Sequence, residues 1–177
     1  SEYVEGSGNN KALEIYNPTS IAVDLSSYII IRYSNGATSA SSAYAIQLVG
    51  TILPNDVNVG VLEKLNPAGT GQELPVADSL QAKADEFYCP VYATNSTWYW
   101  NGNDAIVLAR GSVNEISDAI IVDVFGKIGE DPGSGWIPDS SLSCVGSQYS
   151  WTEDHTLIRK STVLSGNINS VPVYFNP

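Results

Sequence analysis

The sequence predicts an all-β fold in which about eight to ten short strands form an antiparallel β-sandwich. Three observations predict it. Short apolar or alternating runs recur along the chain, turn signals rich in Gly, Pro, Asn and Ser separate them, and only residues 76–84 have the pattern of a short helix. At 177 residues the chain is long enough to bury a real core. We therefore expect residues 1–177 to form a single domain.

The first strand pair is expected within residues 1–17. Residues 2–5 form a short extended run, and residues 11–16 alternate, with Leu13 and Ile15 on one face. The linker between the two runs consists of Gly, Ser and Asn, and Gly and Asn tolerate the positive φ values of a tight turn. We expect a β-hairpin whose second strand turns Leu13 and Ile15 toward the core.

Further strands are expected at apolar runs between turn signals. Residues 28–33 form the most apolar short run and should be a central strand, followed by a turn at Ser34-Asn35-Gly36. Residues 98–100 lead into Asn101-Gly102, which is typical of a type I′ hairpin turn. The run at 115–125 is long enough to contain a bulge. The other expected strands are 44–48, 57–62, 104–110 and 155–159.

Residues 66–95 interrupt this pattern, because Pro and Gly recur there, and we interpret the segment as an insertion. It contains Cys89, whereas Cys144 lies in a second loop-rich stretch, residues 126–149. No other Cys or His lies near either one, so their spacing indicates no metal site. In an oxidising compartment we expect a Cys89–Cys144 disulfide, which would close a loop of about 55 residues and contribute about 4 kcal/mol on the chain-entropy estimate. The alternative is two separate buried thiols.

The charge composition restricts the classes of partner. The chain has 19 acidic and only 8 basic residues, for a net charge of −11. Nucleic-acid binding needs a basic patch, and anionic membrane surfaces repel an acidic protein, so neither is expected as a partner. No apolar run approaches the length of a membrane span. Calcium is the ligand that an acidic surface most readily attracts. Within the chain, we expect Glu14 to form an ion pair with Lys11 or Arg159.

Three clusters of side-chain oxygens are candidate calcium ligands. Calcium takes six to eight oxygens, and no cluster supplies that number alone, so they do not define a ligand set. The spacing of an EF-hand loop is absent. The candidate residues are Glu5, Asn9 and Asn10 in the first loop, Asn103 and Asp104 in another loop, and Glu130 and Asp131 before a proline.

Aromatic residues and the single histidine are the remaining candidates. Trp98 and Trp100 flank Tyr99, and an exposed indole here would stack a sugar or grip a peptide. The alternative is that these rings fill the core and cover the insertion. His155 follows Asp154, but neighbours on a strand point to opposite faces, so the pair is badly placed for a catalytic triad. We predict no catalytic residues and no enzyme activity.

Five stretches spread along the chain carry a family resemblance: SEYVEGSGNNKALEIYN (1–17), AVDLSSYIIIRYSNG (22–36), NGNDAIVLAR (101–110), IVDVFGKIGEDPG (121–133) and DHTLIRKSTVLSG (154–166). Together they resemble the lamin-tail domain family. The resemblance implies an immunoglobulin-like sandwich, found at the end of nuclear lamins and in many bacterial extracellular proteins. It is strongest to the bacterial subgroup that often lies beside secreted nucleases of the endonuclease/exonuclease/phosphatase type. Residues 66–95 and 134–150 are longer than the usual pattern, and residues 161–177 correspond to a closing segment or linker.

The resemblance and the composition together predict a function without catalysis. We expect an accessory or interaction module of an exported bacterial protein, located outside the cell or on its surface. It would position or tether an adjoining domain, such as a nuclease, or bind another protein. Two alternatives remain: a metal-dependent hydrolase that uses the acidic loops, and direct nucleic-acid binding by analogy with lamins, which the net charge opposes.

Overall fold

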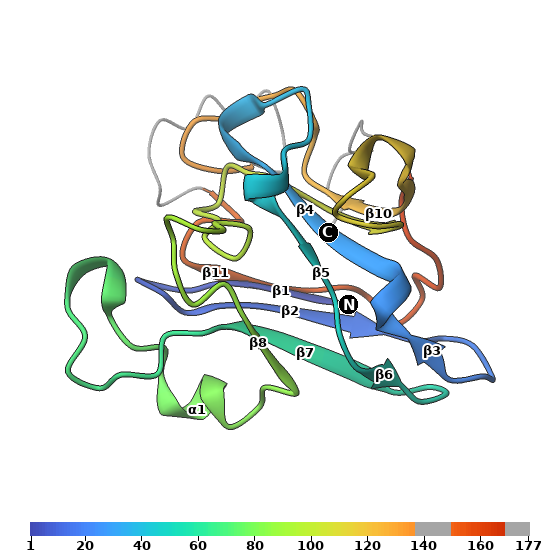
Figure 1. The fold of residues 1–177 in the computed structure, drawn as a ribbon, viewed down its shortest axis with the longest axis horizontal. Coiled ribbons are helices and arrows are strands. Elements are labelled where there is room, and N and C mark those ends of the chain that lie inside the picture. Colours follow the sequence, from blue (N-terminus) through green and yellow to red (C-terminus); the bar gives the residue numbers. More distant parts are fainter. Residues whose placement is uncertain (137–149, 169–177) are drawn as a thin grey trace.

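The computed structural model describes residues 1–136 and 150–168, and these form an all-β sandwich. Two open sheets face each other, and a short third sheet, β3–β6, lies at one end of them (Figure 1). The first sheet has the strand order β11-β1-β2-β7-β8 and the second β10-β9-β4-β5. All neighbouring strands are antiparallel except β7 and β8, which are parallel. The predicted fold class is therefore confirmed.

The elements are short, as the spacing of the turn signals predicts. The strands are β1 Glu2–Glu5, β2 Lys11–Tyr16, β3 Val23–Asp24, β4 Tyr28–Tyr33, β5 Ala45–Gln47, β6 Thr51–Ile52, β7 Val57–Leu62, β8 Glu86–Tyr88, β9 Ala105–Arg110, β10 Ile120–Phe125 and β11 His155–Ile158. One helical turn, α1, spans Asp78–Gln81, and 3-10 turns lie at Leu25–Ser27, Ser34–Gly36, Ser42–Tyr44, Gly71–Glu73 and Ile116–Asp118.

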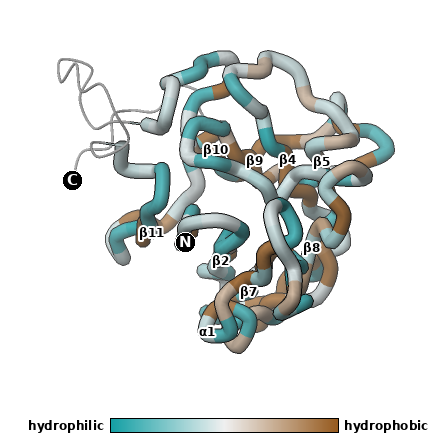
Figure 2. The backbone as a smooth tube through the Cα atoms, turned by 90° about the vertical axis from the view of Figure 1, so that its left-hand side faces the viewer, coloured by the Kyte–Doolittle hydropathy of each residue, from teal (hydrophilic) through white to brown (hydrophobic). Residues whose placement is uncertain are grey.

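The strand β4 is central and apolar because both of its faces are covered. Ile30 points into the space between the two sheets and belongs to the main core. Ile29 and Ile31 point to the other face, where loop residues such as Ile116 and Ile128 cover them and form a second core. Figure 2 shows hydrophobic residues concentrated along β4, β7, β8 and β9. A strand buried on two faces carries a continuous apolar run instead of an alternating one.

Two tryptophans from a loop fill the space between the sheets. Trp98 and Trp100 are 1% and 0% exposed, and their rings lie 5.4 Å apart. The Trp98 Nε1 donates to the Gly60 carbonyl at 3.2 Å, and the Trp100 Nε1 donates to the Val4 carbonyl at 3.0 Å. A Cβ atom on Gly60 would lie 2.8 Å from the Trp98 ring, so the interior of β7 needs glycine here.

Several boundaries differ from the sequence prediction. Residues 98–100 form no strand, so the hairpin predicted at Asn101-Gly102 is wrong; the indoles enter the core from a loop instead. The helix predicted at 76–84 is reduced to the single turn α1. The run at 115–125 is a 3-10 turn followed by β10, with the expected bulge between Ile121 and Asp123.

The predicted insertion at residues 66–95 contributes to the sandwich. It carries α1 and ends in β8, which adds a parallel strand beside β7. The second predicted insertion, 134–150, lies mostly outside the described residues, as does Cys144. The closing segment 161–177 is described only to residue 168, so the last part of that prediction is outside the described residues as well.

Candidate functional site

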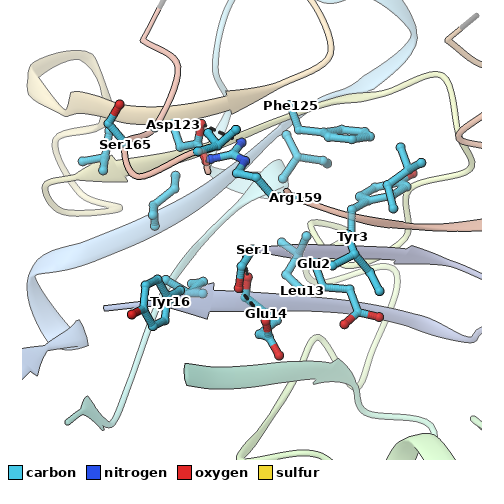
Figure 3. Close-up of a pocket in the computed structure, with 18 of the residues that line it drawn as sticks. Ser1, Glu2, Tyr3, Leu13, Glu14, Tyr16, Asp123, Phe125, Arg159 and Ser165 are labelled. Atoms are coloured by element: carbon cyan, nitrogen blue, oxygen red, sulfur yellow. Dashed lines mark hydrogen bonds and ion pairs between the residues drawn. The ribbon is translucent and has the colours of Figure 1, made fainter. Parts of the chain in front are cut away.

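An apolar cleft opens between the two sheets on the side where β10 and β11 form their edges (Figure 3). Its volume is about 610 Å³. This size is within the roughly 300–1,000 Å³ range of small-molecule and cofactor pockets. The five-stranded sheet supplies Leu13, Ile15 and Leu157, and the four-stranded sheet supplies Ile30, Ile106, Leu108 and Phe125.

The alternation of side chains along each strand produces these walls. Leu13 and Ile15 are two residues apart on β2, and Ile106 and Leu108 are two apart on β9, so each pair lies on one face of its sheet. Both pairs pack toward the space between the sheets. The orientation predicted for Leu13 and Ile15 is therefore confirmed, and both residues also line the cleft.

Tyr3 closes the inner end of the cleft. Its ring stacks on Phe125 with centroids 4.1 Å apart and lies 5.9 Å from Trp100. Its hydroxyl donates to the Thr152 carbonyl at 3.5 Å. Burial raises the pKa of the Tyr3 hydroxyl well above its ordinary value, so the group stays neutral. The uncharged rings of Tyr3 and Phe125 therefore lie at the boundary between the Trp-filled core and the cleft.

A two-pronged ion pair crosses the mouth of the cleft. Arg159 donates through Nη1 to Asp123 Oδ2 at 2.7 Å and through Nη2 to Asp123 Oδ1 at 3.1 Å (Figure 3). Asp123 Oδ1 also accepts the Asn167 N–H at 2.8 Å. Asp123 thus holds the segment after β11 against β10, and the cleft has a polar rim on this side.

The opposite rim is formed by Ser1 and Glu14. The Ser1 hydroxyl donates to Glu14 Oε1, and the Ser1 amino group donates to the Glu14 carbonyl (Figure 3). Burial lowers the pKa of this amino group, and the charge of Arg159 lowers it further. The predicted pairing of Glu14 with Lys11 or Arg159 is wrong, because Lys11 pairs with Glu5 and Arg159 with Asp123.

The segment that follows β11 adds exposed apolar side chains at the cleft. Val163 and Leu164 line it and are 48% and 74% exposed. Large apolar side chains that border an apolar hollow are typical of interaction sites. This segment was not among the sites predicted from the sequence, although its Val-Leu pair between polar residues was an available signal.

The prediction that Trp98 or Trp100 binds a ligand at the surface is corrected. Both indoles are buried between the sheets, and both ring N–H groups are already bonded to backbone carbonyls. A buried ring offers no face to an incoming sugar or peptide. The alternative interpretation, in which these rings fill the core, is the one that the structure supports.

Glu5 fastens three strands together. Lys11 forms a buried ion pair with it and also donates to the Gly6 carbonyl. The other carboxylate oxygen of Glu5 accepts the Asp154 N–H at the start of β11. Burial raises the pKa of Glu5, while the bond and charge of Lys11 act in the opposite direction. The carboxylate therefore joins β1, β2 and β11.

Asn9 and Asn10 attach the hairpin loop to the insertion. The Asn9 Nδ2 donates to the carbonyls of Gln72 and Leu74, at 2.9 and 2.7 Å. The Asn10 Oδ1 accepts the Ala77 N–H at 2.8 Å. Glu5, Asn9 and Asn10 are the candidate calcium ligands of the first loop. Each of them therefore bonds to a different part of the protein.

Asp104 is buried in a polar network beside the tryptophans. It is 1% exposed, its Oδ2 lies 3.2 Å from Arg32 Nη1, and its Oδ1 accepts the Asn35 N–H at 3.0 Å. Arg32 also donates to Ser96 Oγ at 3.0 Å and to the Tyr99 carbonyl. The Asp104–Arg32 ion pair links the loop that carries the tryptophans to β4, and it makes Asp104 a structural residue of the core.

The last predicted cluster is divided between two locations. Glu130 forms an exposed ion pair with Lys127. Asp131 lies beside Asn103, whose Nδ2 donates to Asp131 Oδ1 at 3.2 Å. The structure thus brings together two candidate residues, Asn103 and Asp131, that are far apart in sequence.

Cys89 is buried, and its thiol donates to Asn95 Oδ1 at 3.1 Å. Burial raises its pKa to about 11, so the thiol is protonated and weakly nucleophilic at neutral pH. Because Cys144 is outside the described residues, the Cys89–Cys144 disulfide stays a prediction.

The described residues show neither a catalytic triad nor a metal centre of the usual kind. His155 is exposed, and its ring Nδ1 contacts only the Glu153 carbonyl within residues 1–136 and 150–168. Over the same residues, no three His, Cys, Asp or Glu side chains come close enough to hold a metal ion, and no helix is long and apolar enough to cross a membrane.

Comparisons with protein-family models, curated proteins and solved structures gave no match.

Proposed function

We propose that this chain is a non-catalytic interaction module that binds an apolar segment of an adjoining domain or of another protein in the cleft between its sheets. The observation that carries the proposal is the open apolar cleft of about 610 Å³ between the two sheets. Apolar walls supply binding free energy of about 25 cal/mol per Å² buried, and the polar rim supplies orientation.

The biological context of the proposal comes from the resemblance to lamin-tail domains. Members of the similar bacterial subgroup lie beside secreted nucleases, so we place this module in an exported bacterial protein, outside the cell or on its surface. A tethering role needs a lasting contact and no reacting groups. The rim of the cleft suits that role, since Asp123 and Arg159 are paired with each other and Glu14 accepts the Ser1 hydroxyl.

A cleft-filling variant tests the proposal. In Leu108→Trp the indole would occupy the cleft, because Leu108 lies on its wall. Ile120→Trp is the matched control, since Ile120 is 69% exposed and does not line the cleft. We expect the wild-type chain and the control to select apolar peptides from a displayed library and to bind the dye 1-anilinonaphthalene-8-sulfonate, and Leu108→Trp to lose both.

Two results would contradict the proposal. Equal binding by Leu108→Trp and the wild-type chain would show that the cleft is not the binding site. Hydrolysis of a nucleic acid or phosphoester by the purified wild-type chain, abolished by a single substitution within it, would show that the module is catalytic.

A further inference from the structure

One edge of the five-stranded sheet is open beside the cleft. The strand β11 forms this edge, and among the described residues it pairs only with β1 (Figure 2). The Arg159 N–H donates to the Ser1 carbonyl at 2.8 Å, so alternate residues of β11 turn their backbone groups toward β1. The N–H and C=O groups of Thr156 and Ile158 therefore point away from the sheet. Residues 1–136 and 150–168 supply no hydrogen-bond partner for these groups.

Both edges of the four-stranded sheet are protected, whereas β11 is not. On β10 the Val124 N–H donates to the Asn167 carbonyl at 2.8 Å, and a bulge interrupts the strand. On β5 the Ala45 carbonyl accepts a hydrogen bond from Asn95 Nδ2 at 2.8 Å. In contrast, β11 has a regular register and carries neither Lys nor Pro, the residues that commonly block edge pairing. The free edge of β11 can therefore accept another strand.

A strand added to β11 would direct every second side chain at the cleft. Leu157 lines the cleft and is half-buried. In a strand paired with β11, the residue opposite Leu157 points to the same side of the sheet, toward the space between the sheets. The residues that alternate with it point to the outer face, beside Thr156 and Ile158. Apolar side chains therefore suit the first set of positions.

The charges of the outer face favour basic side chains at the second set. Glu2 and Glu14 lie directly opposite each other on β1 and β2, and like charges in this arrangement destabilise a sheet. Within the described part of the chain, neither carboxylate forms an ion pair with Lys or Arg. Glu2 also lies opposite Ile158, so it is two strand spacings, about 10 Å, from the backbone of an added strand. A Lys or Arg side chain there would extend toward Glu2.

We propose that β11 binds an extended polypeptide segment with alternating apolar and basic side chains by strand addition. This inference rests on the proposed function, because it specifies how the partner segment is held at the same cleft. The outward backbone groups of Thr156 and Ile158 supply hydrogen bonds, and the cleft selects the apolar side chains. The net charge of −11 attracts a basic segment and raises its rate of association.

A fluorescently labelled synthetic peptide in which Leu and Lys alternate tests the proposal. The control peptide has the same composition with its Leu residues in one block, and we expect it to bind the intact chain about tenfold more weakly. Thr156→Pro removes one outward N–H where an edge strand tolerates proline, and it should weaken binding on the order of tenfold. Thr156→Val keeps this N–H and should retain most of the affinity. Circular dichroism checks that each variant is folded.

Amide hydrogen exchange gives a readout that needs no substitution. Saturating peptide should slow exchange at Thr156 and Ile158, because a paired strand bonds the groups at the free edge. Unchanged exchange at both amides would overturn the proposal, as would failure of the wild-type chain to bind the alternating peptide.

Two further outcomes separate this inference from its rivals. If Leu108→Trp abolishes peptide binding and Thr156→Pro leaves it intact, strand addition is wrong while the proposed function of the cleft stands. If the wild-type chain forms a dimer that Thr156→Pro dissociates, the occupant of the edge is a second copy of this chain, and the proposal is overturned.

Discussion

The two ends of the space between the sheets differ in what fills them. At one end a loop inserts Trp98 and Trp100, and the core is closed. At the other end the strands supply aliphatic side chains, such as Leu13 and Leu108, the segment after β11 adds others, and a cleft remains. Packed sheets lie about 10 Å apart, so aliphatic side chains fill the gap only where they interdigitate fully. Large rings delivered by a loop decide which part of this sandwich is closed.

The largest expected effect is on stability at the closed end. Trp100→Ala removes a side chain that is 0% exposed and leaves a cavity, so we expect a loss of about 3–5 kcal/mol. Leu108→Ala, at the open end, should cost no more than about 2 kcal/mol, since its side chain already borders open space. Urea unfolding followed by circular dichroism measures both changes. Equal losses would show that the two ends are packed alike.

Breaking the ion pair at the closed end should likewise cost more stability than breaking the ion pair at the open end. Asp104→Ala leaves Arg32 buried without its carboxylate, and removal of one partner of a buried pair costs about 3–5 kcal/mol. Asp123→Ala breaks the partly exposed pair with Arg159, where we expect about 1 kcal/mol. The free energies of unfolding of the two variants, measured side by side, check this order, and a larger loss in Asp123→Ala would contradict it.

Filling the open end should stabilise the chain slightly. Leu108→Trp adds apolar surface inside the cleft, and we expect a gain of up to about 1 kcal/mol. The same change at Ile120, outside the cleft, should be neutral. Thermal unfolding of the two variants measures the difference. A marked loss of stability in Leu108→Trp would mean that the cleft is too narrow for an indole.

The smallest effect concerns Glu5, which is buried beside Lys11. Its pKa is raised in the folded state, chiefly by burial, so folding favours the protonated form. Its stabilising contribution is present below pH 4.5, its ordinary pKa, and is lost as the pH rises through the folded value. The wild-type chain should therefore lose stability relative to Glu5→Gln as the pH rises above 4.5. Urea unfolding of both chains across this range measures the difference, and the opposite slope would show that Lys11 dominates.

The fold was predictable from the sequence where local pattern and final environment agree. The hairpin of β1 and β2 follows from alternation and a Gly-Asn linker, and β4 follows from its apolar run. The indoles at 98 and 100 were ambiguous, because alternation does not tell a strand from a loop that inserts rings into the core. The parallel strand β8 was missed because it has only three residues and lies in a segment where Pro and Gly recur.

The candidate site was predictable only in part. The inward direction of Leu13 and Ile15 followed from their spacing, but the cleft depends on which strands face them across the sandwich. The bond between Arg159 and Asp123 depends on the path of the chain after β11, which no local pattern encodes. The contact between Asn103 and Asp131 likewise joins two loops that only the fold brings together.

Gly60 has a consequence for how relatives of this chain can vary. Any side chain at position 60 would meet the Trp98 and Tyr88 rings at 2.8–2.9 Å, so the glycine and the indole constrain each other. A larger residue at 60 would require smaller side chains at both 88 and 98. We expect the three positions to change together in related sequences. We expect Gly60 and Trp98, which are 38 residues apart, to persist together in relatives whose loop lengths differ.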